Sequence, residues 1–156
     1  MRVAVTGHMN ITAETEGLVY SEIAKRLAGQ PDLVGVSCIA RGADSVFARV
    51  VLDLGGRLEV ILPTSNYREQ KVKPDHRELF DELIARAAVV RAMGFSEAGR
   101  EAYEAANAAL LDSSDRLVAV WDGQISERGG TGTVVELARS QGIAVDVVWP
   151  TGAARD

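Results

Sequence analysis

The stretch that decides the fold is residues 34–62, VGVSCIARGADSVFARVVLDLGGRLEVIL. It starts with an apolar run over 34–40, passes through a glycine turn, and continues with apolar residues at helical spacing over 43–54. A Gly-Gly pair then ends the helix, and a second apolar run follows over 58–62. A strand, a helix and a further strand in this order predict a βαβ unit, whose two strands are parallel.

The same alternation of short apolar runs and helical stretches extends over the whole chain. It predicts a three-layer α/β domain of Rossmann-like, doubly wound type, with a mainly parallel sheet of five or six strands and helices on both faces. The predicted strands are Val3–Thr6, Val34–Ala40, Leu58–Leu62, Arg116–Trp121 and Ala144–Trp149, with Val89–Met93 as a weaker sixth. The predicted helices are residues 13–28, 43–54, 75–88, 97–111 and 133–141, with Thr12 and Ser96 as N-caps of the first and the fourth.

Length and composition favour a single domain. A chain of 156 residues with 47% apolar residues is typical of one globular unit. We therefore expect one nucleotide-binding domain over residues 1–150 and a loose tail at Thr151–Asp156. The chain enters an apolar run at once, without the features of a signal peptide, and has no run of about 20 apolar residues, so a cytoplasmic protein without membrane contact is expected.

Charge and residue counts argue against several classes of partner. The formal net charge of -5 and the pI near 5.1 predict no nucleic-acid partner, because nonspecific binding of DNA or RNA needs a cationic face. His8, His76 and Cys38 have no metal-ligand spacing, so no metal site is predicted, and Cys38 is expected to be an inert buried thiol. Neither a P-loop nor a dinucleotide fingerprint follows the first strand, and no cofactor is predicted.

The glycine-rich turn before the last predicted helix is the strongest functional signal. Ligands of open parallel sheets bind outside the carboxyl ends of the strands, where such turns lie. The glycines permit close backbone approach, and the threonines add hydroxyl donors at a helix N-terminus, which attracts anions. The predicted phosphate-binding residues are Gly129, Gly130, Thr131, Gly132 and Thr133. The alternative is a capping box, in which Thr133 caps the helix and Glu136 folds back onto it.

Two other turns are predicted to lie at the same edge of the sheet. Gly7 and His8 end the first strand, where the imidazole could contact a ligand or be a satisfied structural group. Gly42 and Asp44 open the second helix. Asp44 could accept hydrogen bonds from ribose hydroxyls, or could simply complement the helix dipole.

The polar segment Thr64–Lys73 is long for a loop and follows a strand. It could be a lid, with Tyr67 stacking on a base and Arg68, Lys71 and Lys73 meeting phosphate, or a solvated loop.

The run Gly129-Gly130-Thr131-Gly132-Thr133-Val134-Val135-Glu136 resembles the G-G-x-G-T-x-x-E motif of the Lonely Guy phosphoribohydrolases. These enzymes belong to the SLOG superfamily, which also contains DprA-like and YpsA-like Rossmann domains. The resemblance implies that the glycine turn binds a nucleotide 5′-phosphate and that Glu136 contacts the ribose near the N-glycosidic bond. In an enzyme of this kind, Glu136 would be the key carboxylate and Arg100 its partner.

Two departures from the enzyme pattern favour binding over catalysis. Arg128 stands where the enzymes have a proline, and the position of their arginine-lysine pair falls near Ala106 and Asn107. The leading hypothesis is a domain that binds or senses a nucleotide or a nucleotide-derived phosphorylated molecule, as a homodimer or higher homo-oligomer. The alternatives are a nucleoside 5′-monophosphate phosphoribohydrolase and a scaffold whose glycine turns only build the fold.

Overall fold

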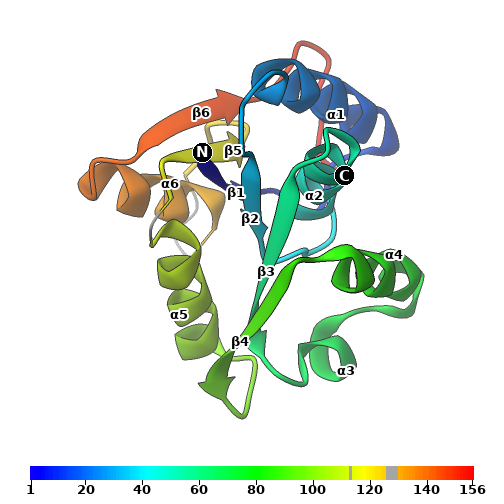
Figure 1. Ribbon diagram of the computed structural model, residues 1–156, viewed down its shortest axis with the longest axis vertical. Helices are drawn as coiled ribbons and strands as arrows, with labels where there is room; N and C mark the ends of the chain where they lie inside the picture. The colour runs from blue at the N-terminus through cyan, green and yellow to red at the C-terminus, as the bar shows by residue number, and fades with distance from the viewer. Residues whose placement is uncertain (113, 126–129) are drawn as a thin grey trace.

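The chain folds into one parallel sheet between two layers of helices. The computed structural model describes residues 1–112, 114–125 and 130–156. Its sheet has six strands in the order β4-β3-β2-β1-β5-β6 (Figure 1). All neighbouring strands are parallel. The strands are β1 (Arg2–Gly7), β2 (Val34–Ser37), β3 (Arg57–Thr64), β4 (Val89–Phe95), β5 (Arg116–Val120) and β6 (Ala144–Val148). The helices are α1 (Ala13–Leu27), α2 (Ala43–Asp53), α3 (Tyr67–Lys71), α4 (Pro74–Arg86), α5 (Arg100–Leu111) and α6 (Thr131–Ser140).

Alternation along β1 divides the core between the two faces of the sheet. Val3 and Val5 pack in one cluster with residues of α1 and α2, whereas Ala4 packs in another with residues of α5 and α6. Successive side chains of a strand point to opposite faces, so a strand buried on both sides needs apolar residues at every position. The predicted doubly wound fold is therefore confirmed, with α1, α2 and α4 on one face and α5 and α6 on the other (Figure 1).

The chain reverses its direction of winding between β1 and β5. Going from β1, the chain steps through β2 and β3 to the β4 edge, and then returns across the sheet to β5 and β6. β1 and β5 are hydrogen-bonded neighbours, paired from Val3 with Arg116 to Gly7 with Val120. This reversal is the topological switch point at which ligands of open α/β sheets bind.

Gly7 allows the elements at the switch point to approach closely. A Cβ at this position would overlap the Cβ of Ala43 and would lie 2.8 Å from the Cβ of Val120. Gly42 has a second constraint, since its φ is +80° and a Cβ there would lie 2.7 Å from the carbonyl oxygens of His8 and Met9. These two glycines let the start of α2 lie directly against the ends of β1 and β5.

Most predicted elements are confirmed within a few residues, with two corrections. The segment Thr64–Lys73 contains the short helix α3, which the sequence did not predict. Helix α5 starts at Arg100 with Gly99 as its N-cap, so the prediction of Ser96 as N-cap is wrong. The prediction of Thr12 as N-cap of α1 is confirmed, because its hydroxyl accepts from Thr15 N.

The expected loose tail is held against the start of α1. Arg155 forms an antiparallel bridge with Ile11, and the amide of Thr12 donates to the carbonyl of Ala154. The amide of Ala154 in turn donates to the hydroxyl of Thr15 at 2.8 Å. Hydrogen bonds with Asn10, Thr12 and Thr15 thus fix a segment whose polar, glycine-containing sequence predicts freedom.

Replacing Gly7 by alanine tests the close approach at the switch point. We expect Gly7→Ala to lower the free energy of unfolding by about 1–3 kcal/mol, the usual cost of overpacking. Gly17→Ala is the matched control: Gly17 lies within α1, a Cβ there meets nothing within 4 Å, and the change should stabilise the protein by about 0.5–1 kcal/mol. Urea unfolding measures both, and equal stabilities of the two variants would contradict the packing argument.

Candidate functional site

The carboxyl ends of β1 and β5 and the start of α6 lie together at the switch point. Gly7 ends β1 and His8 follows it, while Trp121 and Asp122 follow β5. The amide of His8 donates to the carbonyl of Val120 at 3.1 Å, which extends the pairing of the two strands by one step. In a parallel sheet every following helix also starts at this edge, so helix N-termini with their free N–H groups gather here.

The start of α6 carries most of the predicted phosphate-binding residues. Gly130 is its N-cap, Thr131 is buried, Thr133 is exposed, and Gly132 packs so that a Cβ would lie 3.3 Å from the Trp121 ring. Within the described residues no side chain caps this helix. Thr133 is the third helical residue, not the N-cap, so the alternative of a Thr133–Glu136 capping box is wrong. Gly129 lies outside the described residues.

His8 joins the ends of β1 and β5. Its Nε2 lies 3.1 Å from the amide nitrogen of Asp122, which donates to it, and the ring meets Trp149 edge-on at a centroid distance of 5.6 Å. Burial lowers the pKa of His8 and nearby Arg155 lowers it further, although the Asp122 carboxylate opposes both. A neutral imidazole whose Nε2 accepts a hydrogen bond carries its proton on Nδ1. The structural alternative for His8 therefore has specific contacts to support it.

Arg155 brings a cation to the switch point that the sequence analysis missed. Its Nη1 lies 3.3 Å from the carboxylate of Asp122, and its Nε donates to Asn10 Oδ1 at 2.9 Å. The side chain reaches this place only because residue 155 bridges Ile11. No local sequence pattern signals such a contact.

Asp44 is half-buried and has few hydrogen-bond partners. The only hydrogen bond to it within the described part of the chain comes from the amide of Ala40, at a long 3.4 Å. Burial raises the pKa of Asp44 to about 7, and its charge acts in turn on the Cys38 thiol and the Tyr67 phenol. Burial also raises the pKa of Cys38 well above its usual range, as expected for an inert thiol.

The turn before Asp44 is strained and firmly held. Ile39 has a φ of +45°, a left-handed conformation that is unusual for a β-branched residue. Its amide donates to Ser37 Oγ at 2.9 Å, and its carbonyl lies 3.1 Å from His76 Nε2 and 3.3 Å from Ser45 Oγ. His76, to which the sequence assigns no function, thus fixes the turn that positions Asp44.

The segment Thr64–Lys73 does not present the side chains of a lid. Tyr67 is buried against Phe80 and Tyr103, so stacking of its ring on a base is not supported. Arg68 is bound to Asp81 through both Nε and Nη2. Lys71 and Lys73 line a small cavity of about 80 Å³, whose other walls are Met9, Ile39, Ala40, Arg41, Tyr67, Val72 and His76.

The two residues that the enzyme hypothesis needs are not joined. Arg100 is highly exposed and pairs with Glu104 on its own helix at 2.9 Å. Glu136 is exposed on α6. In the part of the chain that the structure describes, no hydrogen bond or ion pair links the two side chains.

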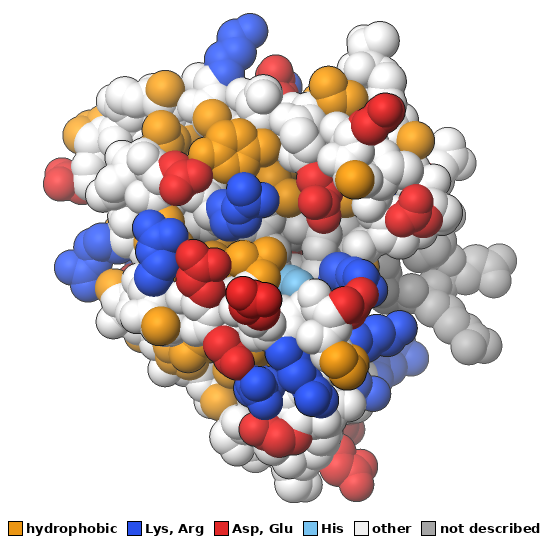
Figure 2. Space-filling model, turned by 90° about the vertical axis from the view of Figure 1, so that its right-hand side faces the viewer, with side chains coloured by type: hydrophobic (Ala, Val, Ile, Leu, Met, Phe, Trp, Pro, Cys, Tyr) orange, Lys and Arg blue, Asp and Glu red, His pale blue; other side chains and the backbone are white. Residues whose placement is uncertain are grey.

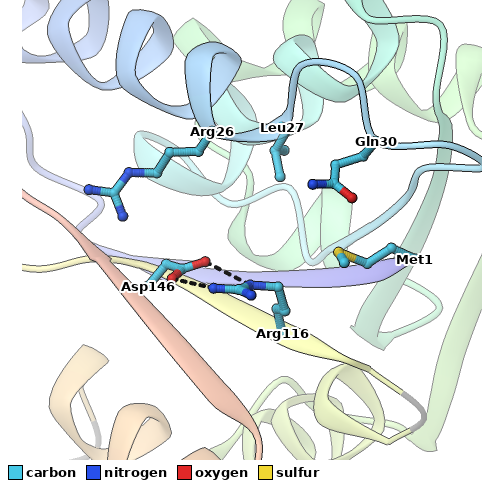
Figure 3. A pocket seen from close by; sticks show the side chains of 6 residues that line it. All are labelled: Met1, Arg26, Leu27, Gln30, Arg116 and Asp146. Carbon is cyan, nitrogen blue, oxygen red and sulfur yellow. Dashed lines mark hydrogen bonds and ion pairs between the residues drawn. The ribbon is translucent and has the colours of Figure 1, made fainter.

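Other hollows lie away from the switch point. A pocket of about 290 Å³ opens at the amino edge of the sheet, where Arg116 and Asp146 form a two-pronged ion pair beside Arg26 and Gln30 (Figure 3). The face that carries α1, α2, α3 and α4 shows acidic and basic side chains interspersed (Figure 2). Over residues 1–112, 114–125 and 130–156, no group of three His, Cys, Asp or Glu side chains could hold a metal ion.

None of the helices in the described residues is long and apolar enough to cross a membrane.

Solved structures share this fold across nearly the whole chain. DNA processing protein A (DprA) from Streptococcus pneumoniae matches 97% of the chain and 51% of its own length, with a TM-score of 0.74 and 20% identity. DprA from Helicobacter pylori matches 99% of the chain and 68% of its own, with a TM-score of 0.72 and 17% identity. The chain has the fold of the SLOG superfamily. It spans about half the length of the S. pneumoniae protein.

A third solved structure shares the fold with a lower TM-score. The molybdenum cofactor carrier protein from Chlamydomonas reinhardtii matches 94% of the chain and 74% of its own length, with a TM-score of 0.58 and 16% identity. No protein-family model and no curated protein matches the chain by sequence. The resemblance to the SLOG superfamily is thus confirmed at the level of the fold.

The exclusion of nucleic-acid partners from the net charge is wrong. DprA from H. pylori has this fold and binds single-stranded DNA. The physical reason is that a whole-chain charge of -5 does not describe the charge at one edge of a sheet. Helix N-termini and a cation such as Arg155 can attract phosphate there even though Asp122 and Asp44 lie at the same edge.

Asp44→Asn tests the half-buried carboxyl through stability. A folded-state pKa of about 7, above the unfolded value of 3.8, means that the wild-type protein loses stability as the pH rises from about 4 to 7. Asp44→Asn has no charge at this position and should not lose stability in this way. Its Tm at pH 8 should therefore exceed that of the wild type by about 3 °C or more, and the difference should vanish near pH 4. Glu14→Gln removes an exposed first-turn carboxylate of α1 and is the control. A constant offset between Asp44→Asn and wild type at all pH values would contradict the assignment.

Proposed function

We propose that the protein binds a nucleotide or nucleotide-derived ligand through a 5′-phosphate at the start of α6, beside the switch point between β1 and β5. The observation that carries the proposal is that α6 starts at this point without a side-chain cap in the described residues. Its first N–H groups are then the natural partners of an anion. Thr131 and Thr133 add hydroxyl groups in the same turn.

A neighbouring cation supports an anion at this place. Arg155 lies next to Asp122, at the same edge of the sheet. The nearby Trp121 ring packs against Gly132, so the turn is held by an aromatic side chain that also reports on it by fluorescence. The DprA and molybdenum cofactor carrier structures support ligand binding as a general role for this fold.

The phosphate has two possible sources, a free nucleotide or a single strand of DNA. We expect an oligodeoxynucleotide and AMP to compete for the same turn if both bind there. A site that accepts only free nucleotides requires a terminal phosphate, and an oligonucleotide without one would then not displace AMP.

Gly130→Asp tests the site by placing a carboxylate at the N-cap of α6. An added negative charge should weaken binding of AMP by tenfold or more, because it competes with the phosphate for the same N–H groups. Tryptophan fluorescence or calorimetric titration measures the affinity, with inorganic phosphate as a competitor.

Gly94→Asp is the matched control for this charge change. Gly94 is exposed on the edge strand β4, where a Cβ meets nothing within 4 Å, and β4 is separated from β5 by three strands. Its AMP affinity should equal that of the wild type. Unchanged AMP binding in Gly130→Asp would place the ligand elsewhere, and failure of the wild type to bind any of these phosphates would refute the function.

The homo-oligomeric state, the cytoplasmic location and the roles of Glu136 and Arg100 stay predictions. Chromatography of AMP mixtures for free adenine tests the hydrolase alternative directly, because cleavage of the N-glycosidic bond releases the base.

A further inference from the structure

Asp44 is a charged residue near the carboxyl edge of the sheet whose position is not explained by apolar packing. It lies in the first turn of α2, and the residue before it, Ala43, fits against Gly7 and Val120 at the switch point. The carboxyl therefore shares the edge of the sheet with the start of α6. The carboxyl is half-buried, and the long bond from Ala40 is the one hydrogen bond that it accepts within the described residues, so its oxygens can take further donors.

The groups around Asp44 come from several elements. Cys38 follows β2, Tyr67 belongs to α3, and Tyr103 on α5 meets Tyr67 with ring centroids 6.3 Å apart. Arg41, the nearest cation along the chain, is turned to Asp75 on α4. Thiol and phenol groups remain uncharged near neutral pH, and none of the described cations forms an ion pair with Asp44.

The strained turn before Asp44 suggests that its position is specified. Ile39 keeps its left-handed conformation through bonds to Ser37, Ser45 and His76, and Ser37 Oγ also donates to the carbonyl of Asp44 at 3.1 Å. Strain of this kind persists only where the surroundings over-determine it, and it gathers at functional positions. A carboxyl that is held in place, half-buried and poorly bonded is suited to accept hydrogen bonds from a ligand.

The chemistry of the two ends of the site limits what that ligand can be. The start of α6 favours an anion, whereas Asp44 repels an anion and favours hydroxyl donors. A ligand that meets both must carry a phosphate at one end and neighbouring hydroxyls at the other. A ribose 5′-phosphate has this arrangement, with its 2′- and 3′-hydroxyls on the side of the ring away from the phosphate.

We propose that Asp44 accepts hydrogen bonds from the ribose hydroxyls of the bound nucleotide, and that the site therefore prefers ribonucleotides to 2′-deoxyribonucleotides. This inference rests on the proposed function, since it assigns the sugar end of the ligand whose phosphate lies at α6. A hydroxyl donating to a carboxylate is a charge-assisted hydrogen bond, so its loss should be readily measurable.

The test compares AMP with 2′-deoxy-AMP on the whole chain. At pH 8 the wild type should bind AMP at least tenfold more tightly than 2′-deoxy-AMP. Asp44→Asn should weaken binding of AMP more than binding of 2′-deoxy-AMP, because the deoxynucleotide loses only the charge-assisted bond of its 3′-hydroxyl, and the preference for AMP should shrink. Ribose 5-phosphate and 2-deoxyribose 5-phosphate repeat the comparison without a base.

The pH dependence of the preference separates a ligand contact from a structural role. A carboxyl with a pKa of about 7 is largely protonated at pH 6, so the preference for AMP should shrink there and grow up to pH 8. Cys38, Tyr67 and Tyr103 have raised pKa values and do not titrate in this window. Glu14→Gln, the exposed first-turn control, should keep both the preference and its pH dependence.

Each outcome decides between the two proposals. Equal affinities for AMP and 2′-deoxy-AMP in the wild type, or an intact preference in Asp44→Asn, overturn the role of Asp44 and leave phosphate binding at α6 in place. Tighter binding of 2′-deoxy-AMP or of an oligodeoxynucleotide also overturns it and assigns the site to DNA. Absence of binding by every phosphate refutes both proposals together.

Discussion

The missing side chain of Gly7 is the constraint on which the edge of the sheet depends. Ala43 and Val120 occupy the space that a Cβ would fill, so the start of α2 rests directly on the ends of β1 and β5. His8 can then follow β1 at the height where the amide of Asp122 donates to its ring. Close packing at one backbone position thus brings two strands and two helix N-termini to the same place. Any side chain at Gly7 would separate them.

The turn between β2 and α2 is stiffened by polar side chains. Ser37, Ser45 and His76 bind the backbone of Ile39 from the strand, the following helix and α4. Their bonds offset the cost of a left-handed isoleucine, which would otherwise relax. Asp44 lies in the first turn of α2, directly after this turn, so its backbone is held in place as well. Burial raises the pKa of this carboxyl, and the bond from the Ala40 amide only partly opposes that effect.

The sequence predicts those features of the fold that depend on residues close together in the chain. Alternation of apolar runs with helical stretches is local, and it predicts all six strands and the helices on both faces of the sheet. Other features depend on contacts across the chain. Helix α3 is a five-residue helix with too few positions to show a period, and Gly99 replaces Ser96 as N-cap because the end of β4 extends to Phe95. Arg155 reaches Asp122 through a bridge to Ile11, more than 140 residues earlier, which no local pattern encodes.

The charges at the switch-point edge of the sheet explain why the net charge of the chain gave a wrong prediction about nucleic-acid partners. Ion pairs such as those of Arg68 with Asp81 and Arg116 with Asp146 cancel charge locally, so the net charge of -5 is spread over the surface. What a ligand meets is the local field: N–H groups at α6, the guanidinium of Arg155, and the carboxyl of Asp44.

The start of α6 attracts negative charge, whereas Asp44 repels it. The pH dependence of ligand binding therefore depends on which end of the ligand lies near Asp44. A phosphate lying close to Asp44 would raise the pKa of the carboxyl, because two like charges disfavour each other, and affinity would then fall as the pH rises through 7. Hydroxyl groups lying there would lower the pKa by bonding to the ionised form, and affinity would rise over the same range. Because the phosphate itself ionises with a second pKa of about 6, the slope of the wild type relative to that of Asp44→Asn reports which end of the ligand faces α2. A ligand that spans the two helix starts in the proposed direction gains from both fields, whereas the reversed ligand loses from both, so the edge selects one orientation by charge alone.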